Sequence, residues 1–233
     1  MLLRERNNLA TAFDALRELY RTLLPEMTDD DFAWFEARGR VRTVPKGGTL
    51  FRAGEVCSHV SFITKGVFYL CLEQTEREIV TAFMREGDYI SEYASFLTRS
   101  AGYSTLVALE ECTVIEHHYD DVQEAYRRFP AFQKFGRLLA ERLFIMLDEG
   151  IRDRSVNTVE TRYVRIVANS PDLLQRVPQY LIASYLGVTP ETLSRIRKRI
   201  AESAMQTNRA SDTTTRTRTG NMSLEGHSSA NEG

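Results

Sequence analysis

The feature that most constrains the fold is a run of short, β-prone segments between residues 41 and 117. Segments rich in Val, Ile, Thr, Phe and Tyr alternate with turn signals such as Pro45–Gly48 and Lys65-Gly66. Short strands with glycine at their corners are typical of a barrel or a jelly-roll sandwich. The strands expected here are Val41–Val44, Thr49–Arg52, Val60–Thr64, Val67–Leu72, Ile79–Met84, Ser104–Leu109 and Thr113–His117.

Helical patterns flank this β-rich region on both sides. Apolar residues at helical spacing precede it, and Thr28 offers an N-cap to a second helix at Asp29–Arg38. Further helices are expected at Asp120–Arg128, Ala131–Arg154 and Asn157–Asn169. The predicted fold class is therefore α+β, with a β-roll or jelly-roll followed by helices.

The expected helix at Ala131–Arg154 is long and apolar on one side. Its apolar face exceeds what one small domain needs, which indicates pairing with the same helix of a two-fold mate. The alternative is a long helix lying across its own barrel. The residues expected at a dimer interface are Phe135, Leu139, Leu143 and Met146.

Residues Gln179–Arg199 have the pattern of a helix-turn-helix. Gly187 supplies the positive-φ corner after the first helix. Thr189 suits the N-cap of the second helix, and Pro190 suits its first position. Ala183 is small where two helices must cross closely.

The outward face of the second helix carries side chains that can form hydrogen bonds with DNA bases. Arg195 can fork onto guanine, and Glu191 can accept a hydrogen bond from cytosine. The alternative is an ordinary helical hairpin with Glu191 and Arg195 as a surface ion pair. The net charge of the chain is only −2, so DNA binding must depend on this local patch. The residues expected to contact DNA are Thr189, Glu191, Thr192, Ser194, Arg195, Arg197, Lys198 and Arg199.

The order of these parts resembles the Crp/Fnr superfamily of bacterial transcription regulators. The supporting motifs are Thr49–Glu55, Ile63–Val67, Arg85–Ile90 and Pro190–Arg195. The resemblance implies a cyclic-nucleotide-binding-like sensor domain at 1–130, a dimerisation helix at 131–156 and a helix-turn-helix domain at 157–205. Residues 206–233 are polar and of low complexity, and we expect them to be a disordered tail.

The resemblance also predicts an effector pocket, and this chain departs from the family pattern there. Glu92 is kept at the ribose position, but Ser91 stands where glycine is expected. Gly102 or Tyr103 stands where an arginine would hold the cyclic phosphate. We therefore expect no tight cAMP binding, but either a vestigial pocket or one for a more apolar ligand. The residues of this degenerate pocket are Ser91, Glu92, Tyr93, Gly102, Tyr103 and Met146.

Other functional classes find little support. Cys57, Cys71 and Cys112 stand far apart with no CxxC, so neither a disulfide framework nor a cysteine metal cluster is expected. No catalytic residues, metal site or cofactor are predicted, because no common catalytic or phosphate-binding motif is present. With no signal peptide or membrane span in the sequence, the expected location is the cytoplasm.

The predicted function is that of a homodimeric, sequence-specific transcription regulator that binds a palindromic double-stranded DNA site. Two recognition helices related by a two-fold axis require such a site. RNA polymerase and an unknown small-molecule effector are further candidate partners. The alternative is a ligand-binding or protein-interaction module that kept the fold and lost specific DNA binding.

Overall fold

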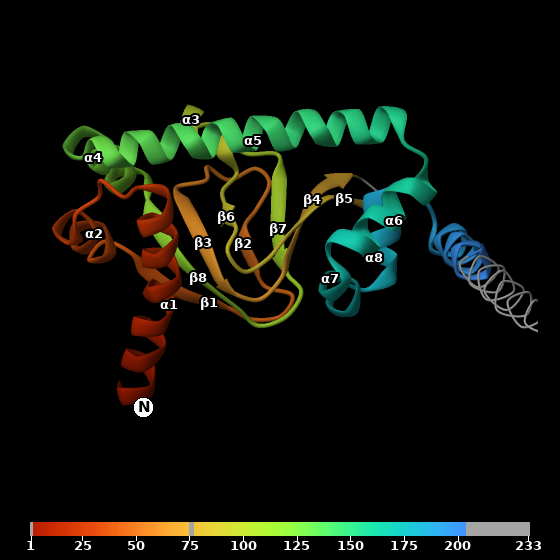
Figure 1. Ribbon diagram of the computed structural model, residues 1–233, viewed down its shortest axis with the longest axis horizontal. Helices are drawn as coiled ribbons and strands as arrows, with labels where there is room; N and C mark the ends of the chain where they lie inside the picture. The colour runs from red at the N-terminus through yellow and green to blue at the C-terminus, as the bar shows by residue number, and fades with distance from the viewer. Residues whose placement is uncertain (1, 75–76, 204–233) are drawn as a thin grey trace, which may run out of the picture. The chain divides into compact units, whose positions relative to one another are not determined.

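The computed structural model describes residues 2–74 and 77–203 of the chain (Figure 1). The chain divides into two compact units, with the boundary between Gly187 and Val188. The first unit contains the β-rich region and most of the helices. The second unit, as far as it is described, is one helix at 190–203.

The first unit begins with two helices, α1 (Leu2–Leu23) and α2 (Asp29–Glu36). Thr28 caps α2 as expected, because its hydroxyl accepts a hydrogen bond from Asp31 N–H at 3.1 Å. The strands that follow are β1 (Arg40–Val44), β2 (Thr49–Phe51), β3 (His59–Lys65), β4 (Phe68–Gln74), β5 (Arg77–Met84), β6 (Tyr89–Ile90), β7 (Ser104–Ala108) and β8 (Cys112–His118).

These strands form two antiparallel sheets, in the orders β1-β8-β3-β6 and β2-β7-β4-β5. The corner between β3 and β4 requires glycine. Gly66 has φ of 100°, and a Cβ there would lie 2.8 Å from Cys112 Cα. The apolar core between the sheets takes residues from both of them: Val44, Ile63, Phe68, Ile90, Leu106, Ala108, Cys112 and Val114.

The remaining elements of the first unit are helical. Helix α3 (Tyr93–Thr98) lies between β6 and β7 in the chain. The helices after β8 are α4 (Tyr119–Arg128), α5 (Pro130–Val156), α6 (Val159–Asn169), α7 (Pro171–Arg176) and α8 (Gln179–Leu186). The long helix α5 runs beside both sheets, and α8 packs against β5 (Figure 1).

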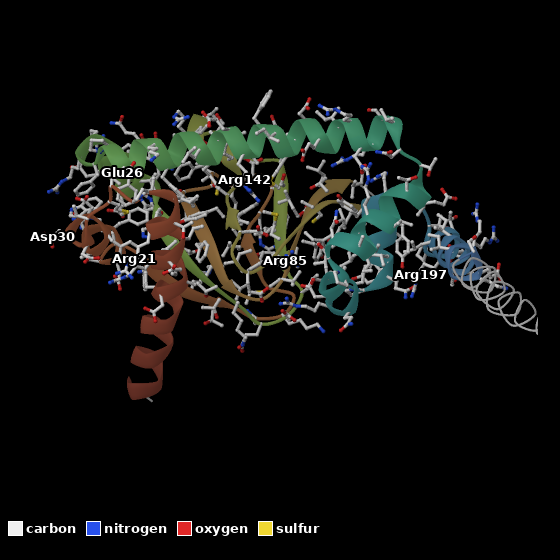
Figure 2. The ribbon with its side chains drawn as sticks, viewed as in Figure 1. Arg21, Glu26, Asp30, Arg85, Arg142 and Arg197 are labelled. Atoms are coloured by element: carbon white, nitrogen blue, oxygen red, sulfur yellow. The ribbon has the colours of Figure 1, made fainter. Side chains whose placement is uncertain are left out.

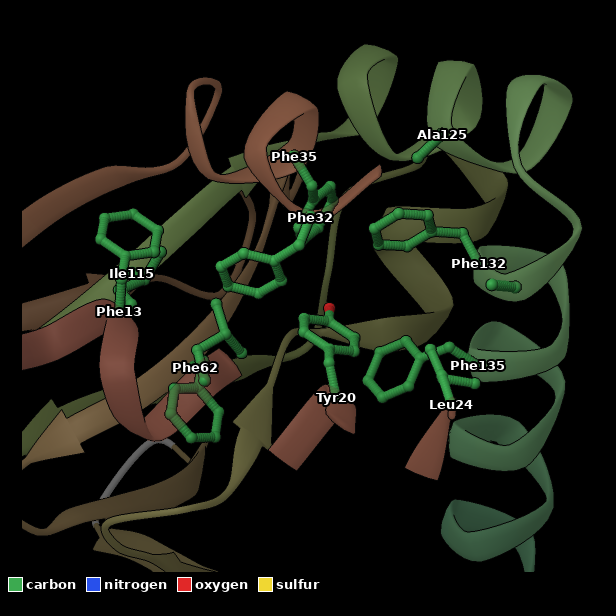
Figure 3. Packing of buried hydrophobic residues seen from close by; sticks show 12 residues of the cluster. Phe13, Tyr20, Leu24, Phe32, Phe35, Phe62, Ile115, Ala125, Phe132 and Phe135 are labelled. Atoms are coloured by element: carbon green, nitrogen blue, oxygen red, sulfur yellow. The ribbon is translucent and has the colours of Figure 1, made fainter. Parts of the chain in front are cut away.

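A second core, rich in aromatic rings, joins α1, α2, α4 and α5 to the first sheet (Figure 3). Tyr20 is at its centre, with ring centroids 4.8 Å from Phe135 and 5.7 Å from Phe132. The Tyr89 hydroxyl bonds the Tyr20 hydroxyl at 2.8 Å, and burial raises the pKa of both phenols. Both therefore stay neutral at physiological pH, and this hydrogen bond fastens α1 to β6.

His117 is a buried titratable group in the same region. Its ring stacks on Phe35 with centroids 3.7 Å apart, and its Nε2 lies 3.1 Å from the Phe35 carbonyl oxygen. Because a carbonyl only accepts, Nε2 carries the proton that it donates. Burial lowers the pKa of His117 to about 4.

This depressed pKa predicts a loss of stability in acid. The unfolded chain binds a proton at His117 near pH 6.5, whereas the folded chain does so only near pH 4. The contribution of neutral His117 to the free energy of unfolding is therefore fully present above pH 6.5. It falls by about 3 kcal/mol on acidification to pH 4. Urea unfolding of the wild type and His117→Gln across this range measures the effect. Burial raises the pKa of Asp88, which acts in the opposite direction, so the difference between the two proteins is the quantity to compare.

The difference in unfolding free energy between wild type and His117→Gln should fall as the pH is lowered from 6.5 to 4, because Gln keeps a donor but does not titrate. A difference that does not change with pH would mean that His117 titrates normally.

The α+β fold class and the β-roll followed by helices are confirmed. Each expected strand is present with ends shifted by a residue or two, and β6 and α3 are additions. Helix α6 ends at Asn169 as expected, and Pro171 then begins α7, where its missing N–H costs nothing. Residues 206–233, where a disordered tail was expected, lie outside the described residues.

Candidate effector cavity and candidate DNA-binding helix

A cavity of about 520 Å³ lies in the first unit between the sheets and α5. Its size falls in the usual range for small-molecule sites. One face of α5 contributes residues at helical spacing from Leu139 to Arg154, and Tyr185 comes from α8. The strand residues in its wall are Phe51, Val60, Leu70, Thr81, Ala82, Met84, Tyr89, Ile90 and Leu106.

Three polar side chains in this wall, those of Ser91, Thr81 and Tyr89, already have partners within the chain. Ser91 Oγ donates to the His59 carbonyl at 3.0 Å, and Thr81 Oγ1 donates to the Leu70 carbonyl at 3.2 Å. The Tyr89 hydroxyl is bonded to Tyr20. A ligand with many hydroxyl or phosphate oxygens would find few free donors here, and burying such groups without partners is costly.

Glu92 is used by the fold and is absent from the described residues that line the cavity. It is the N-cap of α3, because Ser95 N–H donates to its Oε2 at 2.7 Å. Its other oxygen faces Tyr103 N–H at 3.4 Å. A Cβ on Gly102 would lie 2.9 Å from Glu92 Cγ, so glycine leaves room for this carboxylate.

Arg99, the nearest cation to this turn in sequence, is also held in place. Its Nη1 donates to the Cys57 carbonyl at 2.9 Å, and its guanidinium lies 4.4 Å from the centre of the Tyr119 ring. These contacts tie α3 to the segment before β3. Cys57 itself is buried.

Helix α8, the first helix of the expected helix-turn-helix, ends as the sequence predicts. Gly187 follows it with φ of 75°, and its N–H donates to the Ser184 carbonyl at 3.0 Å. Leu181, Ile182 and Ala183 are buried in this helix. The left-handed corner is where the first unit ends.

In the second unit, Thr189 caps the helix at 190–203. Thr192 N–H donates to Thr189 Oγ1 at 3.3 Å, and Leu193 N–H donates to the Thr189 carbonyl at 3.0 Å. Glu191 follows in the first turn, where hydrogen bonds from its own N–H and from Thr189, together with the charge of Arg195, lower its pKa. Glu191 is therefore an anion at neutral pH, ready to accept a hydrogen bond.

The faces of this helix are clearly divided. Leu193 and Ile196 are buried, with 1% and 3% of their surface exposed. Of the residues expected to contact DNA, Thr192 is half-buried and the others are exposed, including Arg197 (Figure 2). A helix with one apolar face and one basic face can dock a core and present cations at the same time.

One group of contacts was missed by the sequence reasoning. Arg176 on α7 pairs with Glu86 at 2.7 Å and also with Glu110, and it lowers the pKa of Glu86 to about 2. Near it, Arg85 pairs with Asp172 at 3.0 Å (Figure 2). These charges hold α7 against the turns of the β-roll. The residues of each ion pair lie far apart in sequence, so no local sequence pattern predicts these pairs.

Comparison with known proteins bears on the first unit and on the whole chain. Residues 41–129 match the family of the cyclic nucleotide-binding domain. The cAMP-activated global transcriptional regulator CRP of Salmonella typhimurium is 23% identical over 187 residues, which is 75% of this chain and 89% of that protein. The CRP of Escherichia coli O157:H7 matches with the same identity and coverage.

Solved structures extend this comparison to the fold. A regulator of the Crp/Fnr family from Eubacterium rectale superposes with a TM-score of 0.64 at 15% identity, covering 79% of this chain and 88% of that one. The c-di-GMP responsive global regulator CLP of Xanthomonas campestris gives 0.62 at 18% identity, covering 76% and 93%. The chain therefore contains a cyclic nucleotide-binding domain, is similar in sequence to CRP, and shares its fold with a regulator of the Crp/Fnr family. Its named relatives are transcription regulators, which points to a regulator and away from an enzyme.

The structure places the expected effector residues in two groups. Ser91, Tyr93 and Met146 line the cavity, whereas Glu92, Gly102 and Tyr103 are absent from its described lining. Tyr103 is 81% exposed. Most of the apolar wall was not anticipated, because its residues come from strands that sequence analysis could not align with one another.

The expected dimer-interface residues also fall into two groups, one in the core of their own chain and one in the cavity wall. Phe135 is buried in the aromatic core of its own chain, and Leu139 packs against that core. Leu143 and Met146 line the cavity. An overlapping stripe of α5 is exposed in the single chain: Phe144 at 73%, Leu147 at 59% and Ile151 at 68%, of which Leu147 and Ile151 also line the cavity.

Two other kinds of site are absent from the described part of the chain. Residues 2–74 and 77–203 contain no group of three or more His, Cys, Asp or Glu side chains arranged to hold a metal ion. No helix in the same residues is long and apolar enough to cross a membrane.

Proposed function

We propose that this chain is a homodimeric, sequence-specific DNA-binding transcription regulator. The observation that carries the proposal is the helix at 190–203, which combines a buried apolar face with exposed Arg195, Arg197 and Lys198. Its capped N-terminus suits the major groove, where Arg195 would read guanine and Glu191 cytosine. Arg197, Lys198 and Arg199 would contact phosphates.

Dimerisation is the second part of the proposal. The exposed stripe of Phe144, Leu147 and Ile151 has the spacing of a helix–helix seam, and contiguous exposed apolar surface of this kind is uncommon on a monomer. Two copies joined along α5 would place two recognition helices about 34 Å apart, on a palindromic site. The proposed organisation is a sensor at 1–130, a dimer helix at 131–156 and a DNA-binding domain at 157–205.

The test is a fluorescence titration of the full chain with DNA from its own promoter at several salt concentrations. Specific binding that weakens steeply with salt supports the proposal. Micromolar binding that is indifferent to sequence would instead favour a ligand-binding or protein-interaction module that lost DNA recognition. RNA polymerase is a further proposed partner, which pull-down on promoter DNA would test.

We also propose that this regulator does not respond to cAMP. Glu92 caps α3, and Arg99 bonds the Cys57 carbonyl. Gly102 or Tyr103 stands where the family resemblance implies a phosphate-binding arginine. Millimolar cAMP should therefore change neither the melting temperature nor DNA affinity. A true ligand at 100 times its Kd would add about 2.7 kcal/mol to the stability, which calorimetry detects easily. An upward melting shift at micromolar cAMP would refute this expectation.

A further inference from the structure

The residues that line the cavity beside α5 indicate which class of ligand it can bind. Nearly all of its described lining is aliphatic or aromatic, and Arg154 is the one charged residue within that lining. Arg154 is exposed, and its side chain forms no ion pair or hydrogen bond with the described residues. The cavity therefore has an apolar body and a free cation where the wall meets solvent.

The cavity is also elongated along α5. Its α5 wall runs from Leu139 to Arg154, which are 15 residues apart in sequence, or about 22 Å at 1.5 Å per residue. Leu139 packs against the aromatic core, so that end is the more buried one. A ligand that fits this shape is long, apolar and anionic at one end.

We infer that this cavity binds a long-chain monocarboxylate, with its acyl chain along α5 and its carboxylate paired with Arg154. The chain would remove apolar wall from water, and the arginine would add a charge-assisted hydrogen bond. A cyclic nucleotide fits poorly, because the side chains of Ser91, Thr81 and Tyr89 already have partners. This inference rests on the proposed regulator function for its biological meaning, although binding itself can be tested separately.

Gly150 offers a way to block the cavity without disturbing the fold. It lines the cavity within α5, and a Cβ added there meets nothing within 4 Å. Leucine is a good helix former, so Gly150→Leu should fill the cavity while supporting the helix. Arg154→Gln removes the charge, and Arg152→Gln is its control because Arg152 is exposed on α5 and is absent from the cavity wall.

The experiment is calorimetric titration of the full chain with dodecanoate and with dodecan-1-ol, both below their aggregation concentrations. We expect saturable binding of dodecanoate, with an upward melting shift, and about tenfold weaker binding of the alcohol. Arg154→Gln should bring dodecanoate down to the affinity of the alcohol, and Arg152→Gln should change neither. Gly150→Leu should abolish binding of both while it melts no lower than the wild type.

The inference is overturned by absence of saturable dodecanoate binding, by binding that survives Gly150→Leu, or by binding that is indifferent to Arg154→Gln. Tight binding of cAMP in the same cavity would also overturn it. Parallel titrations with promoter DNA separate this result from the proposed function. Dodecanoate binding without specific DNA binding would refute only the proposed regulator function. Specific DNA binding without dodecanoate binding would refute only the proposed ligand of the cavity.

Discussion

Arg195→Ala should lower the affinity for the specific DNA site by about 1–3 kcal/mol, or roughly five- to 150-fold, and should relax preference for one G·C pair in each half-site. The reason is geometric. Arg195 is exposed on the helix at 190–203, four residues after Glu191, so both side chains leave the same face. A guanidinium that forks onto guanine O6 and N7 discriminates that base from the others, and alanine cannot.

Lys198→Ala is the matched control for Arg195→Ala. Lys198 is also exposed, and its Nζ lies 3.9 Å from Glu202 Oε1, a weak pairing that leaves it available to phosphate. This variant should weaken binding to all sequences about equally and should reduce the salt slope by about one. Competition titrations against half-sites with single base changes measure both effects. If Arg195→Ala left the base preference unchanged, this helix would not be the element that recognises the bases.

Phe144→Asp should convert the protein from a dimer to a monomer and should abolish specific DNA binding. Phe144 is 73% exposed within one chain, so the change removes no core contact and the monomer should fold normally. In the dimer, the aspartate would bring a charge without a partner into an apolar seam, which is strongly unfavourable. Light scattering should report a fall from twice 26.7 kDa to 26.7 kDa.

Glu149→Lys is the control for this interface. Glu149 is exposed and follows Phe144 by five residues, which places it about 140° around α5 from the proposed seam. This charge reversal should leave the protein dimeric and able to bind DNA. If Phe144→Asp remained dimeric, the seam would have to lie elsewhere. If it became monomeric and kept full affinity for the specific site, the two-fold mode of DNA recognition would be wrong.

The sequence anticipated local structure well wherever a local signal exists. Glycine corners such as Gly66 and Gly187 mark turns, because positive φ excludes most other residues. Thr28 and Thr189 mark helix starts, because a hydroxyl satisfies a free N–H. The buried face of the helix at 190–203 also follows from its periodicity alone. These features depend on residues within one turn of each other.

The candidate effector site was anticipated only in part. The family resemblance pointed to the turn after β6 and implied that a phosphate-binding arginine is missing there. It did not show that Glu92 would serve as the cap of α3, or that Arg99 would be held by the Cys57 carbonyl. The role of Arg99 depends on which backbone carbonyls are left without partners after folding, and Cys57 lies 42 positions away in sequence.

Spacing, caps and glycine corners are local properties of the chain, so they were enough to predict the order of a β-roll, a long helix and two shorter helices joined at Gly187. The division of the apolar residues of α5 among different neighbours became visible only in the folded chain. Phe135 enters the aromatic core, Leu143 faces the cavity, and Phe144 stays exposed. Periodicity identifies apolar faces on a helix, but the neighbour of each face is set by strands and helices far away in sequence. The same reason explains why the ion pairs of Arg176 were visible only in the folded chain.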